Sequence, residues 1–321
     1  MVRVTGRDAD LDGVLVIDKP VGPTSHDVVK WIRRALGTRA VGHAGTLDPA
    51  ASGVLVVAVG QGTKLVSYLT SQAKRYEATL TFGTSTTTLD REGEVVLAEP
   101  VPIELARELA NGAWTEGSLL DRALARERSR REQVPPIFSA VKQNGRAVHE
   151  RARRGEHVEL EPRRVEVYAL EIRHAAEQEQ SVDLSLSVSK GYYVRSLARD
   201  LGETLGVPAH LSALRRVASG PFTLDEALPH DAPRETLCRA LEPLSKAAAR
   251  VLPIGRLSAI GTERARRGQV LSPEHFDAPP DRAVSAWVDA SGELIAIGRP
   301  DDVGSFVVAR GFSHSTSSAA T

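Results

Sequence analysis

One loop and the strand-like run that follows it constrain this chain more than any other stretch of its sequence. The loop reads Gly42-His43-Ala44-Gly45-Thr46-Leu47-Asp48-Pro49-Ala50-Ala51-Ser52-Gly53, and it leads directly into the apolar residues 54–59. This run is rich in β-branched residues and is bounded by glycines, which is typical of a buried strand. We therefore expect residues 54–59 to lie in the middle of a sheet, with the loop at one sheet end.

Asp48 is the carboxylate of this loop, and it stands immediately before Pro49. Proline disfavours the helical conformation for the residue before it, and the loop's three glycines permit unusual backbone angles. Asp before Pro often starts a turn, so one interpretation of this pair is a simple turn. The other is a catalytic carboxylate on a rigidly held loop. The density of special residues, including His43 five positions upstream, favours the second.

The composition limits the classes of partner and compartment. The 321 residues contain 41 basic and 41 acidic side chains and a single cysteine, Cys238. A polyanionic partner would have to meet a local excess of positive charge, such as residues 121–164 with twelve Lys/Arg and seven Asp/Glu. A solvated helical face explains that excess equally well. The single cysteine is typical of a reducing compartment. The sequence also shows no signal-peptide pattern and no apolar run near the roughly 20 residues of a membrane span. We therefore expect a cytoplasmic protein outside the membrane.

The expected elements place further polar side chains at strand ends. Residues 13–17 predict a first strand, which ends at Lys19 and Pro20. Residues 75–82 alternate between apolar and polar, which turns Tyr76 inward, although an inward tyrosine is more often a core residue than a catalytic one. Arg195 follows the alternating residues 182–189 at the start of a helical pattern. A surface arginine lying over Tyr193 and a functional arginine are equally compatible with this position.

The organisation of the chain follows from these patterns. We expect a loose N-terminus over 1–12, a catalytic domain over 13–250, a small β-rich domain over 251–312 and a disordered tail over 313–321. Residues 24–36 carry a capping-box pattern and helical spacing up to Gly37. Residues 117–132 lack a wide apolar stripe and predict an exposed helical insertion. A helix is expected around residues 149–154, after a strand over 139–142.

The sequence lacks the catalytic motifs of several common enzyme classes. It lacks a phosphate-binding P-loop, the His-Glu-x-x-His zinc pattern, the cysteine pair of a base deaminase and the Gly-x-Ser-x-Gly elbow. What remains is a loop carboxylate, an arginine, an inward tyrosine and a histidine. Because an aspartate with an ordinary pKa of about 3.9 is ionised, Asp48 could attack carbon or stabilise a cation. This set suits a rearrangement at a glycosidic carbon without metal or cofactor.

Five motifs closely resemble those of the B-type bacterial tRNA pseudouridine synthases, in order and at the family's spacing from about residue 13 to residue 222. The motifs are Gly13-Val14-Leu15-Val16-Ile17-Asp18-Lys19-Pro20, Gly42-His43-Ala44-Gly45-Thr46-Leu47-Asp48-Pro49, Lys74-Arg75-Tyr76, Ser189-Lys190-Gly191-Tyr192-Tyr193-Val194-Arg195 and Leu214-Arg215-Arg216. The resemblance implies isomerisation of uridine 55, in the T loop of tRNA, to pseudouridine. By motif, Asp48 resembles the family's nucleophile, Arg195 its salt-bridge partner, and Tyr76 the tyrosine that stacks on the target base and accepts a proton. Attack on the base and attack on the ribose both remain open for Asp48.

The resemblance also implies the substrate-binding positions. His43 matches the histidine that fills the space left by the flipped base, and Tyr193 and Leu214 match positions in the substrate pocket. Lys19 and Pro20 match a structural motif beneath the site.

The implied fold is α+β, with a mixed, largely antiparallel sheet, flanking helices and a small PUA-like C-terminal domain that helps to hold RNA. The implied partner is the T arm of tRNA, and we expect a monomer without an obligatory protein partner. Two departures stand out. The family usually has an aspartate where this chain has Thr87, so a second acidic partner of Arg195 is either absent or supplied by Asp90. The segment over residues 117–132 is also longer than is usual in the family.

Two other functions fit the same motifs. One is an RNA-binding folding helper (a tRNA chaperone) whose catalysis is secondary or lost, although the presence of Asp48, Tyr76 and Arg195 argues against loss. The other is a guide-RNA-dependent pseudouridine synthase of the archaeal and eukaryotic type.

Overall fold

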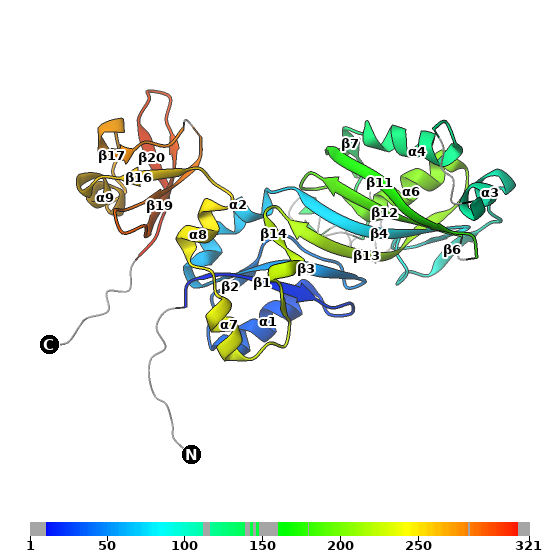
Figure 1. Ribbon diagram of the computed structural model, residues 1–321, viewed down its shortest axis with the longest axis horizontal. Coiled ribbons are helices and arrows are strands. Elements are labelled where there is room, and N and C mark those ends of the chain that lie inside the picture. Colours follow the sequence, from blue (N-terminus) through cyan, green and yellow to red (C-terminus); the bar gives the residue numbers. More distant parts are fainter. Residues whose placement is uncertain are drawn as a thin grey trace, which may run out of the picture.

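A computed structural model describes residues 11–111, 116–138, 142–143, 146–147, 160–178, 180–281 and 283–313 of the chain. Figure 1 shows a large sheet with helices on its faces and a smaller sheet set apart from it. The expected helix around residues 149–154 lies outside the described residues, as do most of the expected 139–142 strand, of the loose N-terminus and of the disordered tail. None of the helices in the described ranges is long and apolar enough to cross a membrane.

The large sheet is mixed and largely antiparallel, as the family resemblance implies. Its strand order is β11 (Val167–Ala176), β12 (Ser181–Val188), β4 (Lys74–Phe82), β13 (Ala209–Ser219), β3 (Ala51–Val59), β1 (Gly13–Lys19) and β15 (Leu228–Pro229). Two short strands join it at the side, β2 (Val41–His43) against β3 and β14 (Phe222–Thr223) against β13. Among the described strand pairs of this sheet, β13–β3 and β1–β15 are parallel and the others are antiparallel.

Strand β3 confirms the prediction of a central buried strand. Residues 54–59 are fully buried, and their strand lies between β13 and β1. The expected loop is shorter than its sequence suggests, however. His43 belongs to β2 and pairs with Val57, and residues 51–53 already belong to β3. The reason is that both ends of the glycine-rich stretch form backbone hydrogen bonds in the sheet, one end as β2 and the other as the start of β3. Residues 44–50 remain as the loop.

Successive residues of β1 and β3 point into two different cores, as the period of two requires. Leu15, Ile17, Leu55 and Val57 face α1 (Ser25–Leu36) and α7 (Arg234–Ala240). Val14, Val16, Val54 and Val56 face η1 (Gly60–Leu65), α2 (Val66–Thr70) and α8 (Leu244–Ala249). Helix α1 confirms its sequence signals, because Thr24 and Asp27 form the capping box and Gly37 ends the helix at a φ of 71°.

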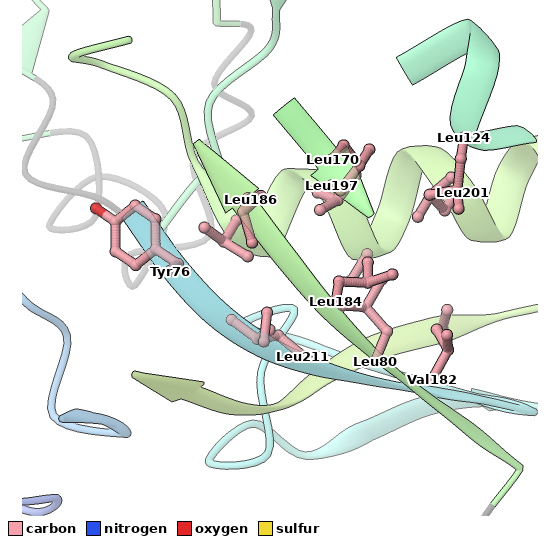
Figure 2. Close-up of a cluster of buried hydrophobic side chains, with 14 of the residues drawn as sticks. Tyr76, Leu80, Leu124, Leu170, Val182, Leu184, Leu186, Leu197, Leu201 and Leu211 are labelled. Carbon is pink, nitrogen blue, oxygen red and sulfur yellow. The ribbon is translucent and has the colours of Figure 1, made fainter. Parts of the chain in front are cut away.

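The other half of the sheet packs against α6 (Val194–Leu205), α4 (Leu119–Arg128) and α3 (Ile103–Asn111). Figure 2 shows Leu197 and Leu201 of α6 above the strand residues Leu184 and Leu80, with Leu124 of α4 beside them. The expectation that residues 117–132 form an exposed helix is therefore wrong. Leu120, Ala123, Leu124 and Glu127 are buried, since a stripe spaced by three and four residues covers one face of even a strongly charged helix.

Short elements connect these layers. They are β5 (Thr84–Thr86), β6 (Val95–Ala98), β7 (Glu132–Gln133), β8 (Lys142–Gln143), β9 (Arg146–Ala147), β10 (Arg163–Arg164) and η2 (Leu224–Glu226).

The smaller sheet is the β-rich C-terminal unit. It has the order β17 (Phe276–Ala278), β16 (Ile254–Leu257), β18 (Ser285–Val288), β19 (Leu294–Pro300) and β20 (Phe306–Gly311), with α9 (Ala259–Arg266) and η3 (Pro273–His275) alongside. Its core is built around the fully buried Trp287, which has edge contacts with Phe276 and Phe306. Gly298 is required opposite this ring, because a Cβ atom there would lie 1.9 Å from Trp287.

Candidate functional site

The loop over residues 44–50 opens onto a cavity of about 290 Å³ at the junction of the two halves of the large sheet. The cavity is lined by Gly45, Thr46, Leu47, Asp48, Thr70, Lys74, Tyr76, Ser189, Lys190, Gly191, Tyr192, Tyr193, Val194, Arg195, Leu214 and Arg216. The structure thus brings together five of the predicted site residues, namely Asp48, Tyr76, Tyr193, Arg195 and Leu214. These five come from four separate stretches of the sequence.

Asp48 and Arg195 form an ion pair in this cavity, with 2.9 Å between Oδ2 and Nε. Arg195 is the second residue of α6, and its side chain is 7% exposed. The same Nε lies 3.6 Å from Oδ2 of Asp90, whose side chain is 8% exposed. Asp90 therefore supplies the second acidic partner that Thr87 does not provide.

The remaining donors of Arg195 bind backbone carbonyls of two further segments. Nη1 donates to the carbonyl oxygen of Thr88 at 3.0 Å, and Nη2 donates to that of Phe138 at 2.9 Å. With its carboxylate contacts, this guanidinium has partners on all its nitrogens, which fixes its plane. Its ion pair with Asp48 thus has a defined geometry.

The Asp48 carboxyl is subject to opposing electrostatic effects. Burial raises its pKa above the ordinary value, the Arg195 guanidinium opposes this rise, and the charge of Asp90 adds to it. Part of the side chain, 38%, remains exposed on the cavity side. The carboxylate therefore has one oxygen held by Arg195 and a route to a molecule in the cavity.

Tyr76 and Tyr193 contribute the aromatic part of the wall. Tyr76 lies at the end of the apolar cluster, and Figure 2 shows its hydroxyl oxygen pointing away from the leucines. Tyr193 occupies the N-cap position of α6, and its side chain makes no capping hydrogen bond. Its backbone is held on both sides by the Gln133 side chain, which accepts from the Tyr193 amide at 2.8 Å and donates to its carbonyl oxygen at 3.2 Å.

Lys19 supports the loop from beneath, where the resemblance places it. The side chain is fully buried, and its ammonium donates to the carbonyl oxygens of Pro20 at 2.9 Å, Pro23 at 2.8 Å and Pro49 at 3.5 Å. Burial lowers the pKa of Lys19 to about 8, against the opposing charge of Asp48. Lys19 thus contacts the loop backbone at Pro49, and Pro20 contributes the carbonyl oxygen that helps to hold its ammonium. Neither residue is among the described residues that line the cavity.

His43 is also absent from the described residues that line this cavity. It lies in β2, and its Nδ1 atom is buried without a hydrogen-bond partner among the described residues. Burial lowers the pKa of His43, and the nearby positive charge of Arg216 adds to that effect. Both effects favour the neutral imidazole of this histidine.

Sequence reasoning missed three charged residues around the cavity. Lys74 and Arg216 belong to two of the quoted motifs, but nothing in their spacing shows that both side chains are buried in the cavity wall. Glu127 lies behind the wall, where Oε1 accepts from the Tyr192 hydroxyl at 2.8 Å. Among the residues that the structure describes, no group of three or more His, Cys, Asp or Glu side chains could hold a metal ion.

Comparisons with known proteins agree with this geometry. The family described as "TruB family pseudouridylate synthase (N terminal domain)" matches residues 33–194, and "tRNA pseudouridylate synthase B C-terminal domain" matches residues 195–247. The tRNA pseudouridine synthase B of Thermobifida fusca (strain YX) is 45% identical over 289 residues, which cover 87% of this chain and 94% of that protein. The protein of the same name from Corynebacterium aurimucosum is 42% identical over 287 residues, covering 89% and 91%.

A solved structure also superimposes on most of the chain. It is titled "Structure of H/ACA RNP bound to a substrate RNA containing 2'-deoxyuridine", and its matching chain has a TM-score of 0.66 and 26% identity. The match covers 95% of this chain and 86% of that one.

Proposed function

This chain belongs to the TruB family of tRNA pseudouridine synthases, and we propose that it converts uridine 55 in the T loop of tRNA to pseudouridine with Asp48 as the nucleophile. One observation carries the proposal. A partly exposed carboxylate is held at 2.9 Å by a buried arginine in a cavity that also contains an inward-facing tyrosine. The match to curated tRNA synthases at 45% identity supports tRNA as the substrate.

The reaction moves the uracil base without adding or removing atoms. The bond between N1 of the base and C1′ of the ribose breaks, and a bond between C5 and C1′ forms. The proton on C5 leaves, and N1 gains a proton. Asp48 supplies the nucleophile for this exchange, and its carboxylate is free again when the new bond is complete.

Access to the uridine requires base flipping. Turning a base out of a folded loop costs a few kcal/mol, and stacking on an aromatic ring returns roughly 1–3 kcal/mol per base. In this proposal Tyr76, which lines the same cavity as Asp48, stacks on the flipped base and accepts the C5 proton. A cavity of about 290 Å³ is near the lower end of typical ligand sites, of about 300–1,000 Å³.

The remaining predicted residues take supporting roles in this proposal. Tyr193 and Leu214 line the cavity and contact the flipped nucleotide, whereas Lys19 and Pro20 hold the loop that carries Asp48. His43 lies outside the cavity wall, and in this proposal it fills the space that the flipped base leaves in the T loop. The C-terminal sheet over residues 254–311 acts as a PUA-like unit that helps to hold the RNA.

The test uses an isolated T-arm stem-loop labelled with tritium at C5 of uridine 55. The purified protein alone should release the tritium and leave pseudouridine at that position. A stem-loop with cytidine 55 and labelled uridines elsewhere should release none. Tritium release only after addition of a guide RNA and partner proteins would favour the guide-dependent alternative. The similarity to the H/ACA structure, at 26% identity, is the observation that supports this alternative. Faster tRNA folding without tritium release would favour the folding helper.

A further inference from the structure

Arg216 is a buried cation in the cavity wall for which the proposed reaction has no role. Its side chain is 1% exposed, and it belongs to none of the ion pairs among the described residues. All its hydrogen bonds go to backbone carbonyls instead. A buried charge without an opposite charge is costly, so these hydrogen bonds are what stabilises the guanidinium in the wall.

The three bonds of Arg216 tie the nucleophile loop to strand β3. Nε donates to the carbonyl oxygen of Val54 at 2.7 Å, which fixes the guanidinium on the sheet. Nη2 donates to that of Gly45 at 3.0 Å, and Nη1 to that of Thr46 at 3.3 Å. The guanidinium therefore joins the rigid sheet to the two residues that begin the turn toward Asp48.

The carbonyl groups of residues 45–49 can be accounted for one by one. Those of Leu47, Asp48 and Pro49 accept from the Ser25 hydroxyl, the Ala51 amide and the Gly22 amide, respectively. Only Arg216 binds those of residues 45 and 46 among the described residues. Two of these five carbonyl groups thus depend on this one side chain.

The backbone of Arg216 is itself fixed. It pairs with Gly53 on β3 and with Tyr76 on β4. A Cβ atom at Gly53 would lie 2.2 Å from the Arg216 carbonyl oxygen, so the two strands are as close there as glycine permits. The guanidinium consequently starts from an immobile anchor.

We propose that Arg216 is a positioning residue that sets the location of the Asp48 carboxylate by clamping the Gly45 and Thr46 carbonyls. This inference rests on the proposed function, because it assigns Asp48 the nucleophile's role. A reacting group displaced by about 1 Å loses on the order of a hundredfold in rate. Loss of the clamp should therefore reduce kcat and leave RNA binding almost unchanged.

The experiment compares Arg216→Met and Arg216→Lys with a matched control, Arg215→Met. Arg215 is the adjacent residue on the same strand, but it binds Asp18 and Ser52 and does not line this cavity. Single-turnover rates and the Kd for the T-arm stem-loop are measured, with thermal unfolding followed in parallel. We expect a rate reduced by about a hundredfold in Arg216→Met at unchanged Kd. Arg216→Lys keeps the charge but only one donor group, so its rate should lie between those of Arg216→Met and the wild type. Arg215→Met should retain the wild-type rate.

A wild-type rate in both Arg216 variants, even with lowered thermal stability, would overturn the inference. If Arg216→Met fails to fold, Arg216→Lys decides alone: a reduced rate at unchanged Kd supports the clamp, and a wild-type rate rejects it. Asp48→Asn is measured alongside. Full product from that variant would refute the proposed function, whereas an inactive Asp48→Asn with fully active Arg216 variants would refute only the clamp.

Discussion

The Oδ2 atom of Asp48 lies 2.9 Å from Nε of Arg195, and the same nitrogen lies 3.6 Å from the carboxylate of Asp90. One guanidinium thus holds two carboxylates that would otherwise repel each other. The three residues come from a loop before β3, a loop after β5 and the first turn of α6. The ion pair is therefore a tertiary feature, and its chemistry depends on how these segments are held.

Asp90 should tune the pH at which Asp48 becomes ionised. Burial raises the pKa of Asp48, Arg195 opposes that rise and the negative charge of Asp90 adds to it. Asp90→Asn removes this last contribution, so the pKa of Asp48 should fall. The acid limb of the kcat/KM profile should consequently move to lower pH. The asparagine keeps an Oδ1 acceptor for Thr88 and for the Glu92 amide, which preserves the loop. An acid limb displaced to higher pH would contradict this account.

Arg195→Met should abolish turnover while leaving RNA affinity close to that of the wild type. The variant leaves two carboxylates without their cation and the carbonyl oxygens of Thr88 and Phe138 without a donor. Breaking a buried pair from one side costs about 3 kcal/mol, so the free energy of unfolding should also fall. Product formation, Kd and urea unfolding measure the three effects. If only RNA affinity fell, Arg195 would be a phosphate contact.

We expect the helix over residues 119–128, α4, to contribute to the stability of the fold through its buried glutamate. The 2%-exposed Glu127 side chain binds the Tyr192 hydroxyl at 2.8 Å and Nε of Arg130 at 2.6 Å. Glu127→Ala leaves the buried Tyr192 hydroxyl without its acceptor and Arg130 with only Asp200 as an ion-pair partner, at 3.3 Å. We expect a loss of about 3 kcal/mol in the free energy of unfolding. Tyr192→Phe, which removes one buried hydrogen bond, should lose about 1 kcal/mol.

The matched control is Glu203→Ala on α6, where the glutamate side chain is 71% exposed. Its stability should stay within about 0.5 kcal/mol of the wild type, as is usual for surface changes. Equal stabilities of Glu127→Ala and Glu203→Ala would show that the helix does not depend on its buried carboxylate.

Lys19 should make stability rise with pH in the alkaline range. Burial lowers its pKa from the ordinary 10.5 to about 8 in the folded chain. Between these values the unfolded state binds more protons than the folded state, so this residue's contribution to stability increases as pH rises. The full increment is about 3 kcal/mol, since one pKa unit corresponds to about 1.4 kcal/mol.

The measurement is the difference in unfolding free energy between the wild type and Lys19→Met, taken at pH values from 7.5 to 10.5. Other groups that titrate in this range are common to both proteins and cancel. The difference should shift in favour of the wild type as the pH rises. A difference that is independent of pH would show that Lys19 has an ordinary pKa in the folded chain.

Local patterns in the sequence predicted much of the fold. The alternation over residues 75–82 gave β4 with Tyr76 inward, and the capping box at Thr24 gave the start of α1. Such signals lie within one element, where periodicity and caps act. The buried face of α4 was missed because its stripe is narrow and its partners, β11 and α6, lie far along the chain.

The site was predicted where a motif carried the signal. Asp48, Tyr76 and Arg195 line one cavity, as the resemblance implied. His43 was expected in the loop, but the ladder between β2 and β3 extends further than the glycines suggest. The burial of Arg216 and Lys74 could not be predicted, because it depends on β3, β4 and β13 meeting around the loop, a long-range property that spacing does not encode.

The most direct test of the central claim is pseudouridine formation by Asp48→Asn on the T-arm stem-loop. Asparagine has nearly the same shape and keeps an oxygen acceptor for Arg195, but its amide is not a nucleophile of comparable strength. We predict that Asp48→Asn binds the stem-loop with wild-type Kd and forms no pseudouridine in a single-turnover assay. Product formed at the wild-type rate would contradict the account.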